Sequence, residues 1–405
     1  MKILITLGSI SPCDDANTNI AKLIAKELQQ MGNEVALFGT SFVNAPVKED
    51  IDGIVYYRKL SVQSKYEQKA EKDLAAGKTL RNCVKHPVYF MKLGYRHFRA
   101  KYVDVKKKDY VRELLKLRQE GFECIIAITA PIHSVTASIE VFKDIPVIWY
   151  QLDPYSSNIT IAYQRIKEKK TQEENILKTV ERVILPKLVY QENLKNNFCD
   201  YKSKMYPVNF PNVRRLEKKE AIDDIIFDKE FINCVFVGVL YEDIRNPEYL
   251  LKMISELPDN NIRVYLIGGG ADEIVANYIE ACKDNLKVEG RHTLQASINA
   301  MLNADVLINI GNSVANMLPS KLNDYISTGK PIVNLCSIHS CPSIEYLAKY
   351  QNVLNLFNSN KVDESVDKFI SFVQKEKEDI PFEQIESVYY ESTPRFVVEQ
   401  MFLEK

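Results

Sequence analysis

The sequence predicts an α/β protein built from two Rossmann-like, doubly wound parallel-sheet domains. Three observations lead to this fold class. The chain has 405 residues, too many for one ordinary hydrophobic core, which favours two or three domains. Short apolar runs alternate with amphipathic stretches, the pattern of βαβ units and a parallel sheet. The alternation occurs twice, on either side of a segment at 206–214 that contains two prolines.

The first series of elements predicts an N-terminal domain over residues 1–206. Its first strand is expected at 2–7, followed by a helix at 18–31 that Asn17 or Thr18 caps and Gly32 ends. Further strands are expected at 34–38, 54–57, 124–128, 147–150 and 183–185.

The second series predicts a C-terminal domain over residues 207–380, because the prolines at its start disfavour helix and fit a linker. Its strands are expected at 234–237, 263–267, 286–288, 306–310 and 332–335. Its helices are expected at 247–257, 294–303 and 321–328, and residues 381–405 should form one or two more.

The alternation is interrupted by a basic, aromatic-rich insertion at about residues 60–110. Residues 78–118 contain thirteen Lys or Arg and three acidic residues, with aromatic side chains interleaved between 89 and 102. Such a stretch suits the surface of an anionic membrane. It equally suits a solvated helix that packs one apolar face on its own domain.

Overall composition excludes several other classes of protein. A net charge of -1 gives no general basic field for nucleic acid. No run approaches the ~20 apolar residues of a membrane span, and no cleavage pattern follows the first strand, so a cytoplasmic protein is expected. Eight scattered cysteines without a CxxC pair suit reduced thiols.

No metal ion or cofactor is expected. The DxD string is Asp50-Ile51-Asp52, in a polar stretch where a solvated turn is a better interpretation than a metal-diphosphate site.

In open α/β sheets ligands bind beyond the carboxyl ends of the strands. One such end carries Gly238, followed by Arg245 just before a helix that opens at Pro247. The glycine would let a ligand approach the backbone, and the arginine offers forked donors to phosphate oxygens. The alternative is a tight turn with a surface arginine.

Two further segments follow strands of the same domain. Gly268, Gly269 and Gly270 end a strand and indicate close backbone approach without identifying a nucleotide. Further along, Ser320 is a plausible N-cap, so the helix beginning at Lys321 would offer an anion site. Asp324, one turn later, could accept hydrogen bonds from ribose hydroxyls. Alternatively, Lys321 and Asp324 form a surface ion pair.

These segments together resemble the donor domain of the retaining GT-B glycosyltransferases of family four. The resemblance implies two Rossmann-like domains facing across a cleft, with the C-terminal helix of 381–405 returning to the N-terminal domain. It places Gly238 and Arg245 at the donor diphosphate. The donor-binding residues that it implies are Gly8, Gly238, Arg245, Gly268, Gly269, Asn316, Met317, Leu318, Pro319, Ser320, Lys321 and Asp324.

The chain departs from the family pattern at two positions. The family has two glutamates eight positions apart, the first near the transferred sugar and the second on the ribose. Here these positions hold Asn316 and Asp324. Val239 stands where many members have a second phosphate-binding arginine, so Arg245 and Lys321 would share the charge neutralisation.

The N-terminal domain offers fewer candidates. Gly8 and Ser9 resemble the family's flexible loop near donor and acceptor. His133 and Asp153 each follow a strand and could orient or deprotonate an acceptor hydroxyl, so they are candidate catalytic residues with Arg245 and Lys321. The alternatives are a helix-capping histidine and an Asp-Pro turn.

The expected function is transfer of a sugar from a nucleoside diphosphate sugar, UDP- or GDP-linked, to a glycan or lipid-linked acceptor. The resemblance implies retention of configuration and a role in surface polysaccharide biosynthesis. The expected location is the cytoplasm, with possible contact at the cytoplasmic face of the membrane. Two alternatives remain: a sugar-nucleotide epimerase, or a non-catalytic nucleotide-sugar-binding protein.

Overall fold

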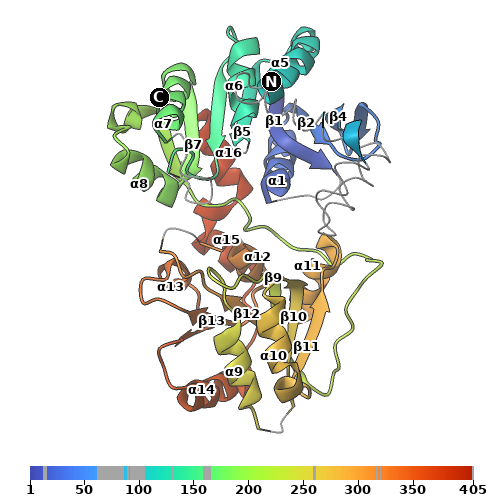
Figure 1. Ribbon diagram of the computed structural model, residues 1–405, viewed down its shortest axis with the longest axis vertical. Helices are drawn as coiled ribbons and strands as arrows, with labels where there is room; N and C mark the ends of the chain where they lie inside the picture. The colour runs from blue at the N-terminus through green and yellow to red at the C-terminus, as the bar shows by residue number, and fades with distance from the viewer. Residues whose placement is uncertain are drawn as a thin grey trace. The chain divides into compact units, whose positions relative to one another are not determined.

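The computed structural model shows two compact units, each an α/β domain with its own sheet (Figure 1). It describes residues 1–11, 16–61, 86–88, 91, 105–129, 131–157, 166–258, 261–315, 318–319 and 321–403. The N-terminal unit contains Met1–Pro211 and Pro394–Lys405, and the C-terminal unit contains Asn212–Thr393. Among the helices of this described part, none has the length and hydrophobicity needed to cross a bilayer.

The N-terminal unit is built on an eight-stranded sheet in the order β3-β4-β2-β1-β5-β6-β7-β8. All neighbouring strands are parallel except β3 and β4. The strands are β1 (Lys2–Ser11), β2 (Glu34–Ser41), β3 (Lys48–Ile51), β4 (Ile54–Leu60), β5 (Cys124–Thr129), β6 (Val147–Gln151), β7 (Arg182–Pro186) and β8 (Met205–Val208). The strand order reverses between β1 and β5, so this sheet is doubly wound, as the sequence predicts.

Helices cover both faces of this sheet. They are α1 (Ala16–Gln30), α5 (Val105–Leu117), α6 (Ile132–Val141), α7 (Ile166–Thr179), α8 (Lys187–Lys195) and, from the end of the chain, α16 (Pro394–Phe402). Along β1, Ile3 and Ile5 lie in one hydrophobic cluster and Leu4 in the other, because successive strand residues point to opposite faces. Val397 of α16 lies in the same cluster as Ile3, so this last helix completes the core of the N-terminal unit.

Two sequence expectations at the start of this unit are wrong. Strand β1 continues through Gly8 and Ser9 to Ser11, with register shifts against β2, where a loop was expected. Helix α1 begins at Ala16, so Asn17 and Thr18 lie inside it. Instead of capping the helix, the Thr18 hydroxyl donates to the carbonyl of Ser9 at 2.7 Å, which ties α1 to the end of β1.

The polar stretch at Asp50 contains the solvated turn expected from the sequence, at the exposed residues Asp52 and Gly53, and this turn is the tip of a β-hairpin that was not expected. Strands β3 and β4 pair antiparallel around Asp52 and Gly53, which have φ of 54° and 79°. An Asp-Gly pair with positive φ at both residues is the favoured two-residue hairpin turn. The Asp50 carboxylate accepts from the backbone N–H of Gly53 at 2.9 Å, so it stabilises this turn.

Most of the basic insertion at 60–110 lies outside the described residues, but its last part forms the start of α5. Tyr110 and Leu114 of this helix are buried in the core. Its cations form ion pairs, among them Lys107 with Glu140 at 2.7 Å and Lys116 with Glu113 at 2.6 Å. Helix α5 therefore packs an apolar face on its own domain.

The C-terminal unit is built on a six-stranded parallel sheet in the order β11-β10-β9-β12-β13-β14. The strands are β9 (Ile232–Val239), β10 (Ile262–Gly269), β11 (Leu286–Gly290), β12 (Val306–Ile310), β13 (Ile332–Cys336) and β14 (Val353–Phe357). This is the Rossmann order, and it reverses between β9 and β12.

Seven helices of the C-terminal unit belong to the described residues. They are α9 (Glu248–Ser255), α10 (Asp272–Cys282), α11 (Leu294–Asn303), α12 (Lys321–Thr328), α13 (Pro342–Leu347), α14 (Val362–Gln374) and α15 (Phe382–Val388). The expected bounds of α11, α12 and β12 agree with the structure. Helices α10, α13 and α14 and strand β14 were not expected from the sequence.

An asparagine ladder, formed by Asn309, Asn334 and Asn355, crosses three strands of this sheet. The three residues face one another in the register of β12, β13 and β14. The Asn309 amide donates to Asn334 at 2.7 Å, and the Asn334 amide donates to Asn355 at 2.7 Å. Because Asn309 and Asn334 are buried, these bonds satisfy polar groups that would otherwise destabilise the core.

Candidate functional site

The candidate site lies at the carboxyl ends of β9 and β12, where the order of the C-terminal sheet reverses. Strand β9 pairs with β12 through Cys234 and Val235. Beyond these residues the polypeptide leads into one loop at 240–247 and another that begins at Gly311. Ligands of open α/β sheets bind at such a switch point.

Arg245 is held across this switch point by the loop that follows β12. Its Nε and Nη2 atoms donate to Oδ1 of Asn312 at 3.3 and 3.2 Å, and its Nη1 donates to the carbonyl of Val239 at 3.3 Å. Asn312 is buried, and Arg245 is half-buried. The other guanidinium N–H groups bond to no residue that the structure describes, so they can bind an anion. Arg245 is therefore not the surface side chain of the alternative interpretation.

The two loops are also joined through their backbones. The N–H of Ser313 donates to the carbonyl of Ile244 at 2.8 Å, and its hydroxyl donates to the carbonyl of Asp243 at 2.9 Å. These bonds flank the contact between Arg245 and Asn312. The guanidinium is thus positioned by a preformed loop pair, which lowers the ordering cost of binding an anion.

The glycines beside Arg245 allow close packing of backbones. A Cβ atom on Gly268 would lie 1.8 Å from the carbonyl oxygen of Gly238, and one on Gly270 would lie 2.2 Å from that of Leu240. Gly268 and Gly270 have φ of +141° and +94°, which L side chains rarely adopt. Gly269 ends β10 beside Val239 of β9. These glycines bring the ends of β9 and β10 together under the loop that bears Arg245.

Tyr325 of α12 bonds the backbone of β9 just beyond the residues that pair with β12. Its hydroxyl accepts from the N–H of Val237 at 2.7 Å and donates to the carbonyl of Val237 at 3.1 Å. The side chain is buried, and burial raises the pKa of the phenol above its ordinary value. A hydroxyl is the side-chain group suited to this position because it can donate and accept at once.

Asp324 lies beside Tyr325 and is held by two cations. Its Oδ1 accepts from Nη1 of Arg214 at 2.7 Å, and its Oδ2 accepts from Nζ of Lys321 at 3.1 Å. Burial opposes ionisation, but the two positive charges outweigh it and keep the pKa of Asp324 below its ordinary value. The ion pair of the alternative interpretation is therefore present, but its carboxylate is buried: the Asp324 side chain is 7% exposed and that of Lys321 30%.

Three of the expected donor residues lie outside the described part of the chain: Asn316, Met317 and Ser320. Between them, Leu318 is half-buried and Pro319 is buried. Within the described residues, no group of three or more His, Cys, Asp or Glu side chains is placed to hold a metal ion.

The expected acceptor-side residues all belong to the N-terminal unit. The carbonyl of Gly8 accepts from the Tyr110 hydroxyl at 2.7 Å, which ties β1 to α5. His133 is the second residue of α6 rather than its cap, which is Pro131, and its ring packs edge-on against Tyr110 with centroids 4.6 Å apart. Asp153 follows β6 and its side chain is exposed, but partial desolvation by the surrounding protein raises the pKa of its carboxyl group.

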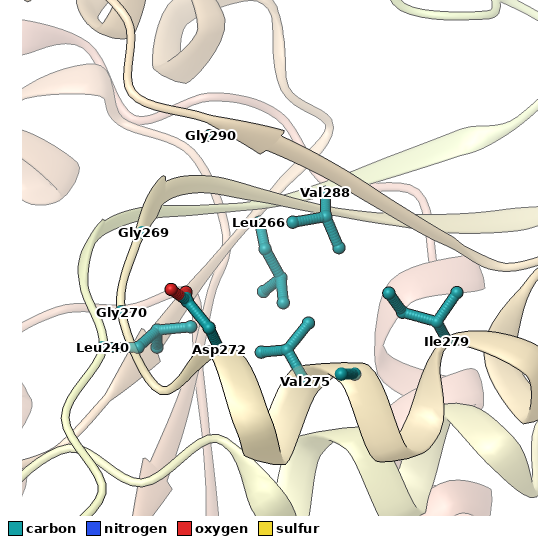
Figure 2. A pocket seen from close by; sticks show the side chains of 10 residues that line it. Leu240, Leu266, Gly269, Gly270, Asp272, Val275, Ile279, Val288 and Gly290 are labelled. Carbon is teal, nitrogen blue, oxygen red and sulfur yellow. The ribbon is translucent and has the colours of Figure 1, made fainter. Parts of the chain in front are cut away.

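A pocket of about 200 Å³ opens beside the glycine segment, between α10 and the strands β10 and β11 (Figure 2). Leu266 and Val288 line it from the strands, and Val275 and Ile279 from the helix. Its single charged lining residue is Asp272, whose carboxylate would repel phosphate. The pocket therefore suits an uncharged group, and the cations that could bind phosphate lie elsewhere.

Three functional candidates were missed by sequence reasoning: Asn312, Arg214 and Tyr325. Asn312 follows β12 directly, so its place at a strand end was a signal that could have been used. Arg214 is 110 residues from Asp324 in sequence, and Tyr325 is 88 residues from Val237. No local pattern predicts contacts over such separations.

Comparisons with known proteins agree with this architecture. No family model and no curated protein matches the sequence. Among solved structures, the lipopolysaccharide outer core galactosyltransferase WaaB is 11% identical, with a TM-score of 0.55 over 99% of this chain and 98% of that one.

Two further structures are similar over nearly the whole chain. HepE from Anabaena, in complex with UDP and glucose, is 13% identical, with a TM-score of 0.56 over 99% of this chain and 95% of that one. Sucrose-phosphate synthase from Thermosynechococcus elongatus is 11% identical, with a TM-score of 0.57 over 99% and 97%. The chain therefore has the two-domain α/β fold of GT-B glycosyltransferases.

Proposed function

We propose that the chain is a glycosyltransferase that moves a sugar from a nucleoside diphosphate sugar to a glycan or lipid-linked acceptor. The observation that supports this most directly is the anchoring of Arg245 by Asn312 at the switch point of the C-terminal sheet. A guanidinium held in this way presents fixed positive charge where the fold places its ligand. A diphosphate is the ligand group that matches it.

The chemistry proposed for the donor side is stabilisation of the leaving nucleoside diphosphate. As the bond between sugar and phosphate breaks, negative charge grows on the phosphate oxygens. Preorganised cations stabilise that charge more in the transition state than in the ground state. Arg245 and Lys321 supply them, so no metal ion is required in this proposal.

Asp324 is proposed to bind the ribose of the donor. A carboxylate accepts hydrogen bonds from vicinal hydroxyls, and its low pKa keeps it ionised at neutral pH. UDP is the first nucleotide to test, because HepE is described in complex with UDP and glucose. GDP is the second.

The acceptor side is proposed to use the carboxyl edge of the N-terminal sheet. His133 at the start of α6 and Asp153 after β6 are the candidates to orient the acceptor hydroxyl. The raised pKa of Asp153 makes its carboxylate a somewhat stronger base than usual. In a retaining reaction the leaving phosphate can itself take the proton. The proposed setting is surface polysaccharide assembly at the cytoplasmic face of the membrane.

A thermal-shift panel of UDP, GDP, ADP and CDP with their common sugars tests the donor site. A ligand at 100 times its Kd stabilises the folded state by about 2.7 kcal/mol. For a domain of this size, that raises the Tm by roughly 5–10 °C. Arg245→Ala and Lys321→Ala are expected to abolish the rise for the nucleotide that binds.

Arg263→Ala is the matched control for Arg245→Ala. Arg263 lies near the opposite end of β10, where it pairs with Asp228 at 3.1 Å and is 15% exposed. This variant should keep the nucleotide response of the wild type. If no nucleotide raises the Tm of the wild type, or if Arg245→Ala responds like Arg263→Ala, the proposal is wrong.

Product analysis then separates transfer from its alternatives. With the identified donor and an extract of lipid-linked glycans, a transferase releases nucleoside diphosphate only when acceptor is present. An epimerase forms an isomeric sugar nucleotide without acceptor, and a binding protein forms no product. The anomeric proton of the product, measured by NMR, shows whether configuration is retained.

A further inference from the structure

Arg214 is the second cation on Asp324, and neither composition nor motif points to it. It belongs to the extended segment that opens the C-terminal unit. Its backbone N–H donates to the hydroxyl of Ser327 at 3.2 Å, so the segment is fixed to the last turn of α12. Its Nη1 donates both to Asp324 at 2.7 Å and to the carbonyl of Asn212 at 2.9 Å.

The two cations on Asp324 differ in how firmly they are held. Arg214 is anchored at its backbone and at its guanidinium, and its side chain is 23% exposed. Lys321 is 30% exposed, and its bond to Asp324 is the single one that it makes within the described part of the chain. Lysine is also a flexible point charge, whereas the guanidinium is a rigid fork. Lys321 is thus the partner that can move.

An incoming nucleotide changes what each group must do. If Lys321 turns to a phosphate, a buried carboxylate with no other cation would lose its compensation, which is costly. Arg214 removes that cost because it stays on Oδ1. The Oδ2 atom is then open to a hydroxyl of the ribose.

We propose that Arg214 is a positioning residue for nucleotide binding. It stays bound to Oδ1 of Asp324 while the Lys321 ammonium group leaves Oδ2 and binds a phosphate. A ribose hydroxyl then takes the place of Lys321 at Oδ2. The inference rests on the proposed function, because it assigns a ribonucleoside diphosphate to the site. Its consequence is that discrimination between ribose and deoxyribose depends on Arg214, a residue that need not touch the ligand.

The test compares UDP and GDP with their 2′-deoxy counterparts by titration calorimetry. Wild type is expected to bind one of the ribonucleotides at least about tenfold more tightly than its deoxy form, since a hydrogen bond to a charged group is lost. In Arg214→Gln this ratio should fall to about one through weaker binding of the ribonucleotide. Arg214→Lys keeps the positive charge but lacks the forked guanidinium, and its ratio of ribonucleotide to deoxynucleotide affinity should be several-fold below that of wild type.

Arg215→Gln is the matched control. Arg215 is the next residue, is exposed, and pairs with Glu383 rather than with Asp324. It should keep the wild-type ratio. In a double-mutant cycle, Arg214→Gln should have no further effect on the ratio once Asp324 is changed to Asn, because the two residues act as one unit.

The outcomes separate this inference from the proposed function. A wild-type ratio in Arg214→Gln and Arg214→Lys overturns the role of Arg214, and the transferase proposal stands. If Arg214→Gln does not fold, the ratio in Arg214→Lys decides alone. A wild type that binds UDP or GDP without preferring ribose also overturns the inference. A wild type that binds neither overturns the proposed function first.

Discussion

Replacing Tyr325 by Phe tests how the switch point of the C-terminal sheet is closed. The change removes one oxygen atom and leaves the ring in the core. That oxygen bonds both the N–H and the carbonyl of Val237, at 2.7 and 3.1 Å. Strand β12 cannot replace it, because its pairing with β9 is limited to Cys234 and Val235.

The expected cost follows from the two backbone groups that lose their partner. A buried polar group left without a hydrogen bond costs about 1–3 kcal/mol. Two such groups give about 2–6 kcal/mol of unfolding free energy. For a domain of this size, the Tm of the C-terminal unit should fall by roughly 5–20 °C.

Urea unfolding followed by far-UV circular dichroism measures this loss. Tyr265→Phe is the matched control, because Tyr265 is buried in the same cluster and its hydroxyl forms no hydrogen bond within the described part of the chain. Its cost should be below about 0.5 kcal/mol. Trp149 is the one tryptophan and lies in the N-terminal unit, so its fluorescence gives an internal control.

The reasoning is refuted if Tyr325→Phe and Tyr265→Phe have the same midpoint and slope. That result would mean that the Val237 groups find other partners at no cost. A change in slope without a change in midpoint would also count against it, because the expected effect is on stability and not on the area exposed.

Three further predictions concern the same unit. Gly268→Ala should lower the unfolding free energy by about 3–5 kcal/mol, the sum of strain at positive φ and overpacking. Gly290→Ala is the control, because Gly290 has φ of +66° and open space around its Cβ, and should cost only about 1 kcal/mol. Equal losses in urea unfolding would contradict the close approach of Gly268 to the Gly238 carbonyl. Asp324→Asn should cost about 1–3 kcal/mol at pH 7. Because the folded pKa of Asp324 is depressed, its stabilisation is present above the unfolded value of about 4 and lost as pH falls through the lower folded value, so a difference from wild type that stays constant between pH 7 and pH 3 would disprove the pairing. Asn312→Asp keeps the shape of the side chain beside Arg245 but adds negative charge, so nucleotide affinity should fall at least about tenfold in the thermal-shift panel. An unchanged response would show that the phosphate does not bind beside Arg245.

The parts of the fold that depend on local pattern could be predicted from the sequence. The bounds of β12, α11 and α12 were predicted correctly, because continuous apolar runs and helical periodicity mark them clearly. The hairpin at Asp52 was missed although the Asp-Gly pair is a recognised signal for it. Strand β14 is short and only partly buried, so its pattern is weak.

The candidate site was predictable only in part for a different reason. Gly238 and Arg245 stand at a strand end, and chain position alone suggests a ligand there. What holds them, however, comes from distant segments. The bond from Arg245 to Asn312 spans 67 residues, and that from Arg214 to Asp324 spans 110. Such contacts depend on the packed tertiary structure, which one sequence does not encode in any local motif.

The asparagine ladder constrains how this sheet can be altered. Asn309 donates to Asn334 and Asn334 donates to Asn355, so the three amides form a chain with a beginning and an end. Changing the middle residue alone to leucine would strand an acceptor on one side and a donor on the other. The Ser343 hydroxyl is buried and donates to the same Asn334 oxygen at 2.9 Å, so changing all three to apolar residues of similar shape should be nearly neutral only if Ser343 is changed to Ala as well. For protein engineering, the three positions on three strands and Ser343 are therefore one design variable, to be replaced together or left alone.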